Sequence, residues 1–169
     1  MSTVFEVTKL RKNFGGLAVT NDVSLNMVKG DRVALIGPNG AGKTTFVNLV
    51  TGNLAATSGT VALDGENVSR LNAMQRVRRG LVRSFQVTRL FFDMTPEEHV
   101  ALAVLQREGK TGRILGNYRK MPEVMDEVRD ILDALGPLHL GQLRVSEIAY
   151  GQQRLLEIAL ALALRPKVL

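Results

Sequence analysis

The nine residues 37–45, GPNGAGKTT, constrain the fold more than any other stretch of this 169-residue sequence. They match the pattern Gly-x-x-x-x-Gly-Lys-Thr, in which a glycine-rich turn joins a strand to the N-terminus of a helix. Three glycines let the backbone wrap closely around an anion, with its N–H groups pointing inward. An apolar segment, RVALI, precedes the loop, and an amphipathic one, TTFVNLV, follows it. The sequence therefore predicts a phosphate-binding loop in an α/β fold.

The polar residues of this loop have distinct expected roles. Lys43 supplies a point charge for the β- and γ-phosphates of a nucleotide, and Thr44 offers a hydroxyl to Mg²⁺. A helix beginning near Lys43 places the positive end of its dipole under the phosphates. A second GKT, at 109–111, has Val104 where the first glycine is needed, so we predict a loop there. The predicted phosphate-binding residues are Gly37, Pro38, Asn39, Gly40, Ala41, Gly42, Lys43, Thr44 and Thr45.

Composition indicates a globular protein and argues against disulfide-bonded, secreted and membrane-spanning chains. Apolar residues make up 45% and charged residues 22% of the chain, as in one globular domain. There is no Cys, which excludes disulfides and thiolate metal sites. The N-terminus lacks the pattern of a signal peptide, and the apolar run LLEIALALAL has about half the ~20 residues of a spanning helix.

The net charge of +6 raises the question of nucleic-acid binding. The densest basic cluster is Arg76, Arg78, Arg79 and Arg83, and no aromatic residue lies among them to stack on bases. We interpret this cluster as a solvated basic face and expect no nucleic acid as a partner. Neither histidine, His99 or His139, is predicted as a site.

Hydrophobic patterning predicts strands in the first half of the chain and helices in the second. Strands are expected at 3–10, 17–28, 31–36, 59–65 and 80–85. Turns are expected at Lys29-Gly30-Asp31 and at Asp64-Gly65. A helix is expected to begin at Thr95-Pro96-Glu97-Glu98 and to run to about Gln106. Pro122 begins another, which Gly136-Pro137 ends, and its apolar face comprises Val124, Met125, Val128, Ile131, Leu132 and Leu135. A βαβ-type core with an inserted helical subdomain follows.

Four elements in order resemble the motifs of ABC-type ATPases: Phe14 in KNFGG, the phosphate loop, Gln86 in RSFQ, and IAYGQQR at 148–154. The resemblance implies that Phe14 stacks on adenine. It also implies that Gln86 senses Mg²⁺ and the attacking water, acting with Lys43 in catalysis.

The implied fold is an α/β P-loop NTPase core with an N-terminal antiparallel β subdomain and an inserted helical subdomain. Residues 1–87 would form the nucleotide-binding part and 88–163 the helical subdomain with the signature motif. Residues 164–169 would begin the next core strand.

In this family, two subunits associate head to tail, and the signature of one contacts the nucleotide of the other. The residues expected to do so are Ala149, Tyr150, Gly151 and Gln152. Gly151 opens a helix whose N–H groups can hold a γ-phosphate. The family usually has Ser at the position of Ala149, so one hydrogen bond worth about 1.5–3 kcal/mol is absent. RSFQVTRLF and AYGQQRLLEIA resemble the subgroup that serves branched-chain amino acid importers, where Ala is common.

The resemblance implies ATP and Mg²⁺ as cofactors and a second ABC ATPase subunit, forming a homo- or heterodimer. It further implies integral membrane permease subunits, an indirect link to a solute-binding protein, and a place on the cytoplasmic face of a bacterial plasma membrane. Residues 89–92 would link the nucleotide state to the permease groove, or Leu90 and Phe91 would simply form core. Two alternatives stay open: a soluble ABC-type ATPase acting on nucleic acid or the ribosome, and a nucleotide-binding module that does not hydrolyse.

The family continues beyond RPKVL into the Walker B strand, with an Asp-Glu pair and later a His. We therefore expect a chain truncated before that strand, the front portion of a longer ATPase. By itself, this 169-residue chain is expected to have little or no ATPase activity and to be marginally stable or prone to aggregation.

Overall fold

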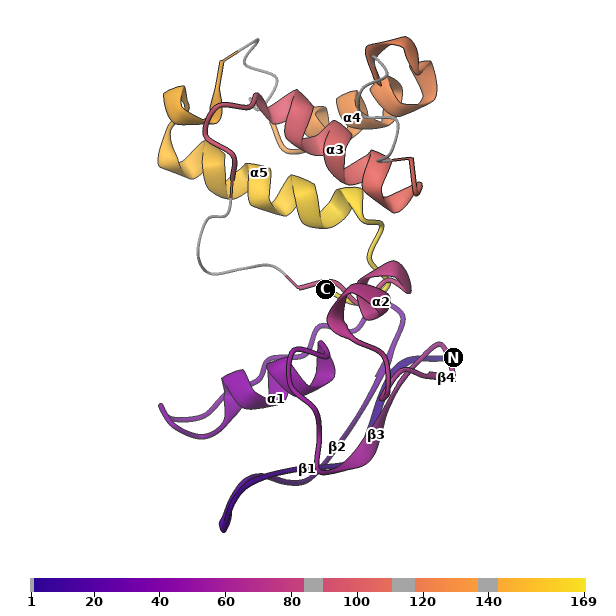
Figure 1. Ribbon diagram of the computed structural model, residues 1–169, viewed down its shortest axis with the longest axis vertical. Helices are drawn as coiled ribbons and strands as arrows, with labels where there is room; N and C mark the ends of the chain where they lie inside the picture. The colour runs from indigo at the N-terminus through magenta and orange to yellow at the C-terminus, as the bar shows by residue number, and fades with distance from the viewer. Residues whose placement is uncertain (1, 84–89, 111–117, 137–142) are drawn as a thin grey trace. The chain divides into compact units, whose positions relative to one another are not determined.

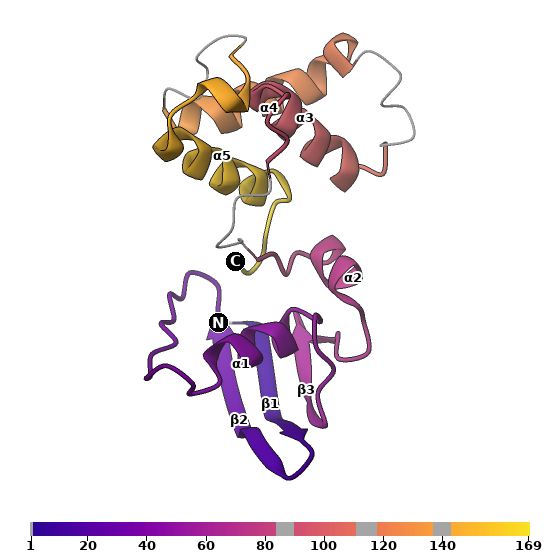
Figure 2. The ribbon, with the colours of Figure 1, turned by 60° about the vertical axis from the view of Figure 1, so that its left-hand side comes forward.

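The computed structural model describes residues 2–83, 90–110, 118–136 and 143–169 (Figures 1 and 2). The chain divides into two compact units. The first contains Met1–Val82 together with Val168, and the second contains Arg83–Lys167 and Leu169. Each unit has its own hydrophobic core, so each is described by itself.

The first unit is built on a four-stranded antiparallel sheet of order β2-β1-β3-β4. Its strands are β1 (Thr3–Phe14), β2 (Leu17–Val28), β3 (Ser58–Leu63) and β4 (Glu66–Asn67). Helix α1 (Lys43–Val50) packs its apolar side against one face of the sheet (Figure 2). The buried core of this unit comprises Phe5, Val7, Leu10, Leu49, Val50, Val61, Leu63, Val68 and Leu81.

Both turns predicted from the sequence are present. Asp64 and Gly65 have φ of 48° and 77°, the pair of positive values that a two-residue hairpin needs. Between β2 and the loop that follows, Asp31 accepts a hydrogen bond from the backbone N–H of Val28 at 2.9 Å and returns one from its own N–H at 3.1 Å. These local signals fix where β2 and β3 end.

The strand predicted at residues 31–36 does not form. A strand needs a neighbour whose backbone groups pair with its own, and none of the described strands lies beside this segment. Its apolar residues are consequently open, with Leu35 49% and Ile36 88% exposed. The segment is an irregular connection from β2 to the phosphate loop (Figure 2).

The strand predicted at 80–85 is reduced to a single parallel bridge between Leu81 and Val168. Val82 donates its N–H to the carbonyl of Val168 at 2.9 Å, and Val168 donates to Gly80 at 3.1 Å. Residues 84 and 85 of that prediction lie outside the described residues.

One member of the basic cluster is buried, which corrects the prediction of a solvated face. Arg76, on α2 (Ala73–Arg78), is only 3% exposed, whereas Arg78 on the same helix is exposed. The guanidinium donates to four backbone carbonyls. Its partners are Leu49 at 2.9 Å, Val50 at 2.7 Å, Ser69 at 2.8 Å and Leu71 at 3.0 Å.

The position of Arg76 explains why its burial is tolerated. Leu49 and Val50 are the last residues of α1, and the carbonyls at a helix C-terminus lack intrahelical donors and carry the negative end of the dipole. Burial lowers the pKa of Arg76, yet a guanidinium stays charged in proteins. A buried cation therefore caps the helix that follows the phosphate loop.

In the described residues of the second unit, the helices are α3 (Pro96–Arg107), α4 (Pro122–Ala134) and α5 (Tyr150–Ala163), with short 3₁₀ turns η2 (Tyr118–Lys120) and η4 (Val145–Glu147). The predicted capping box is present: Thr95 Oγ1 accepts from the N–H of Glu98 at 3.2 Å, and the Glu98 carboxylate accepts from that of Thr95 at 2.9 Å. No helix in the described part of the chain is long and apolar enough to cross a membrane. The buried core comprises Leu90, Val100, Ala101, Val104, Leu105, Val124, Val128, Leu132, Val145, Ile148, Leu156, Ala159 and Ala163.

An ion pair joins the three helices at one end of this unit. Arg107 of α3 makes two 2.7 Å hydrogen bonds to the carboxylate of Glu127 on α4, and a third of 2.7 Å to the carbonyl of Ala163, the last residue of α5. The Arg107 guanidinium lowers the pKa of Glu127. As with Arg76, an arginine caps the carbonyl end of a helix.

His99 has a structural role in the second unit. Its Nε2 accepts a hydrogen bond from the backbone N–H of Phe91 at 2.9 Å, which leaves Nδ1 to carry the proton and donate to the Thr95 carbonyl at 3.0 Å. The side chain is 3% exposed, and burial lowers its pKa, opposed by the Thr95 hydrogen bond and by Glu98. The neutral imidazole thus fixes residue 91 against the start of α3.

This arrangement predicts that acid weakens the second unit. The pKa of His99 is lower in the folded state than its unfolded value of about 6.5. The stability of the fold is therefore greatest above pH 6.5, where His99 is neutral in both states, and it decreases as the pH falls below 6.5. One proton limits the loss to ~1.4 kcal/mol per pH unit. Urea unfolding at pH 7.5 and 5.5 should show this loss in the wild type and a smaller one in His99→Gln. Equal losses in both proteins would contradict the role given to His99.

Candidate phosphate-binding loop and signature segment

The loop at residues 37–45 has the backbone that an anion cradle needs. Gly37, Gly40 and Gly42 have φ of 152°, 83° and 81°, values that residues with a Cβ rarely adopt. Gly42 is the N-cap of α1 and has no side chain to occupy the N–H groups of the first helical turn. Those N–H groups and the positive end of the helix dipole are therefore directed at whatever occupies the loop.

The loop rests directly on strand β2. A Cβ built on Gly42 would lie 2.8 Å from the carbonyl oxygen of Val19 and 3.3 Å from its Cγ1. Glycine at 42 is consequently required twice, for its positive φ and for the close approach of two backbones. Val19 was not among the predicted site residues, because its contact with the loop arises only when β2 is placed beside α1.

Lys43 lies folded into the loop. Its ammonium donates to the carbonyls of Gly37 at 2.6 Å and Pro38 at 2.7 Å, so two of its three N–H donors are hydrogen-bonded within the loop itself. A phosphate would offer a charged acceptor in place of these neutral carbonyls. The ammonium is thus held at the loop before a ligand arrives.

Thr44 is exposed in the first turn of α1, where its hydroxyl can reach a ligand, and Thr45 follows it half-buried. Among the described residues, no group of three His, Cys, Asp or Glu side chains could hold a metal ion. Gln86, the other predicted metal and catalytic residue, lies outside the described residues.

Phe14 ends β1, and its side chain is 49% exposed. It pairs with Leu17 at the start of β2, two residues before Val19, the contact of Gly42. Two residues of strand span about 7 Å. The structure thus brings the predicted adenine platform and the phosphate loop to the same short stretch of β2.

The signature segment begins α5 in the second unit. Ala149 is the N-cap, and its N–H donates to the side-chain oxygen of Gln152 at 2.9 Å. A Cβ on Gly151 would meet nothing within 4 Å, so the backbone of the first turn can be approached closely. Tyr150 is 64% exposed, with its ring 5.2 Å from the guanidinium of Arg154.

Gln153, which was not predicted as a site residue, fixes the residues that precede this segment. Its amide donates to the carbonyls of Val145 at 3.1 Å and Ile148 at 3.3 Å, which ties the turn before α5 to the helix. The phosphate loop and the signature segment belong to different units.

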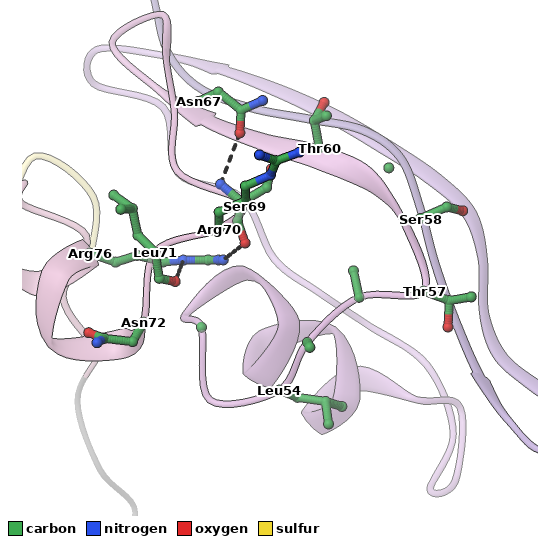
Figure 3. A pocket seen from close by; sticks show the side chains of 14 residues that line it. Leu54, Thr57, Ser58, Thr60, Asn67, Ser69, Arg70, Leu71, Asn72 and Arg76 are labelled. Carbon is green, nitrogen blue, oxygen red and sulfur yellow. Dashed lines mark hydrogen bonds between the residues drawn. The ribbon is translucent and has the colours of Figure 1, made fainter.

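A shallow pocket of about 920 Å³ lies between the end of α1 and strand β3 (Figure 3). Hydroxyl and amide groups line it, among them Thr57, Ser58, Thr60, Ser69 and Asn72. Arg76 also lines the pocket, and Figure 3 shows its guanidinium hydrogen-bonded to backbone carbonyls. None of the predicted site residues lines this pocket.

These features are those expected of a phosphate-binding loop, and comparison with known proteins identifies the family. Residues 20–169 match the sequence profile of the ABC transporter family. The chain belongs to this family, and the predicted family and fold class are confirmed.

The curated relatives include branched-chain amino acid transport proteins. Over 169 residues, the chain is 40% identical to the high-affinity branched-chain amino acid transport ATP-binding protein LivG of Salmonella typhimurium, covering 96% of this chain and 66% of the relative. Over 173 residues, it is 38% identical to the corresponding protein BraF of Pseudomonas aeruginosa, covering 98% and 67%. The chain thus spans about two thirds of the length of these relatives.

Two solved structures show the same fold. One is a nucleotide-free ATP-binding cassette from an ABC transporter, with 28% identity, a TM-score of 0.77, and coverage of 97% of this chain and 66% of that one. The other is the ADP conformation of an ATP-binding cassette of an ABC transporter, with 28% identity, a TM-score of 0.79, and coverage of 98% and 66%.

Proposed function

We propose that this chain carries the ATP-binding part of an ATP-hydrolysing subunit that powers an ABC importer of branched-chain or related amino acids. The phosphate loop carries the proposal, because it combines three glycines of positive φ, an uncapped helix N-terminus and the ammonium of Lys43. The transported class is suggested by the printed functions of the relatives LivG and BraF.

In this proposal, the loop residues share the work of holding a triphosphate. Backbone N–H groups of residues 40–45 surround the β-phosphate, and Lys43 turns from its two carbonyls to the β- and γ-phosphate oxygens. Phe14 stacks on the adenine ring. The hydroxyl of Thr44 and the side chain of Gln86 would hold Mg²⁺, which would neutralise charge on the phosphates.

The signature segment acts on the nucleotide of a second ABC ATPase subunit. The open first turn of α5 at Gly151 offers backbone N–H groups to the γ-phosphate from the partner, with Tyr150 and Gln152 beside it. Ala149 contributes no hydroxyl, so closure depends on the backbone. The remaining partners are permease subunits in the plasma membrane, reached from its cytoplasmic face, and through them a solute-binding protein.

Transport by the full natural protein tests this proposal. A bacterial strain lacking its gene should take up a labelled branched-chain amino acid poorly and recover with the wild-type gene. Lys43→Ala should fail to restore uptake and should lower ATP hydrolysis by about 100-fold, because it removes a charge from the transferring phosphate. Uptake restored in full by Lys43→Ala would refute the assignment of the loop.

Copurification separates the proposal from its alternatives. The affinity-tagged full natural protein should bring down integral membrane subunits. Recovery of RNA or DNA in their place would support a soluble ATPase acting on nucleic acid. Saturable ATP binding without turnover in the presence of the membrane subunits would indicate a non-hydrolysing module.

A further inference from the structure

The aromatic ring at residue 14 has a charged neighbour. The ammonium of Lys12 lies 5.1 Å from the centroid of the Phe14 ring, within the range of a cation–π contact. The two side chains are two residues apart near the end of β1, and the ring is 49% exposed. One face of the ring is therefore occupied by a cation.

Lys12 is held in place by a backbone acceptor. Its ammonium donates to the carbonyl of Ala55 at 2.8 Å, a contact across 43 residues of sequence. The same loop is tied to β1 twice more: Thr57 donates its N–H to Arg11 at 2.8 Å, and its hydroxyl accepts from the N–H of Asn13 at 3.1 Å. The end of β1 and the ammonium are thus anchored together.

We propose that Lys12 is a positioning residue that covers one face of Phe14 and leaves the other face for the base of a bound nucleotide. This inference rests on the proposed function. A partly exposed aromatic ring can otherwise rotate, and a contact that selects one orientation reduces the ordering that binding requires. The ammonium also draws π-electron density toward itself, which suits the open face to an electron-rich purine.

The affinity of the full natural protein for Mg·ATP and for inorganic tripolyphosphate, which has no base, tests this role. Lys12→Met should weaken ATP binding about two- to fivefold and leave tripolyphosphate binding unchanged, because it removes a single exposed cation–π contact. Lys12→Arg should bind ATP about as tightly as the wild type, since a guanidinium can also stack on the ring. Lys9→Met, which removes the same charge from an exposed side chain of β1, should change neither affinity.

A double-mutant cycle makes the test specific to the ring. Phe14→Leu should weaken ATP binding on its own, and Lys12→Met should then add no further loss. The inference is overturned if Lys12→Met weakens the binding of ATP and of tripolyphosphate equally, or if its effect on ATP affinity is no larger than that of Lys9→Met. It is also overturned if Lys12→Met lowers ATP affinity by the same factor in the wild type and in Phe14→Leu. If the wild type binds neither ligand, the proposed function itself fails, and this inference with it.

Discussion

Replacing Arg76 by Met should destabilise the nucleotide-binding unit by about 3 kcal/mol. Methionine has a similar length but no donors, so four backbone carbonyls each lose a hydrogen bond from the guanidinium, and the two bonds to Leu49 and Val50 are buried. Two of them end α1, whose dipole also loses a compensating cation. In the wild type, folding removes the charged guanidinium from water, which costs free energy. The Met variant avoids this cost, so the net loss of stability is smaller than the lost hydrogen bonds alone would give.

Hydrogen exchange of the α1 amides and urea unfolding of the full natural protein measure the effect. Arg78→Met is the matched control, because Arg78 is an exposed arginine on the same short helix. We expect the control within about 0.5 kcal/mol of the wild type. Equal losses for the two variants would mean that the capping of α1 by Arg76 adds nothing to stability.

Gly42→Ala should abolish tight nucleotide binding. The methyl group would meet the carbonyl oxygen of Val19 at 2.8 Å in a residue whose φ is 81°, so either β2 or the loop must move. The left-handed conformation alone costs about 1–2 kcal/mol. Displacement of the loop adds the loss of aligned N–H groups, and we expect ATP affinity to fall at least 100-fold.

Gly65→Ala is the control for backbone strain. Gly65 has a nearly identical φ of 77°, and a Cβ there would meet nothing within 4 Å. It should lose about 1 kcal/mol of stability and retain its affinity for ATP. Unchanged ATP affinity in Gly42→Ala would show that the contact with Val19 does not govern the loop.

Features set by neighbouring residues were predictable from the sequence. The alternation between Leu17 and Val28 gave β2 from end to end, and the Thr95 capping box located the start of α3. The capping box joins residues only three apart, and the alternation of β2 is visible in its own residues, although the strand it pairs with lies elsewhere in the chain.

Features that depend on distant contacts were not predictable. The apolar run at 31–36 reads as a strand, yet pairing needs a neighbour that its own residues do not specify. Arg76 looks like its exposed neighbours, and its burial depends on carbonyls 26 and 27 residues away. Burial of a charge is decided by the acceptors that the fold provides.

The candidate site divides in the same way. A contiguous motif was sufficient to find residues 37–45, whereas Val19 and Lys12 reach the site only through the pairing of β1 and β2 and the loop at Ala55. The roles of all the predicted site residues, in the loop, at Phe14, at Gln86 and in the signature segment, stay predictions.

The central claim is that the loop at 37–45 binds the phosphates of ATP through its backbone and Lys43. Isothermal titration of the full natural protein with Mg·ATP, wild type beside Lys43→Ala, tests it most directly. The account predicts saturable binding by the wild type and at least tenfold weaker binding by Lys43→Ala, since one charge-assisted contact to phosphate is lost. No saturable binding, or equal binding by both proteins, would contradict it.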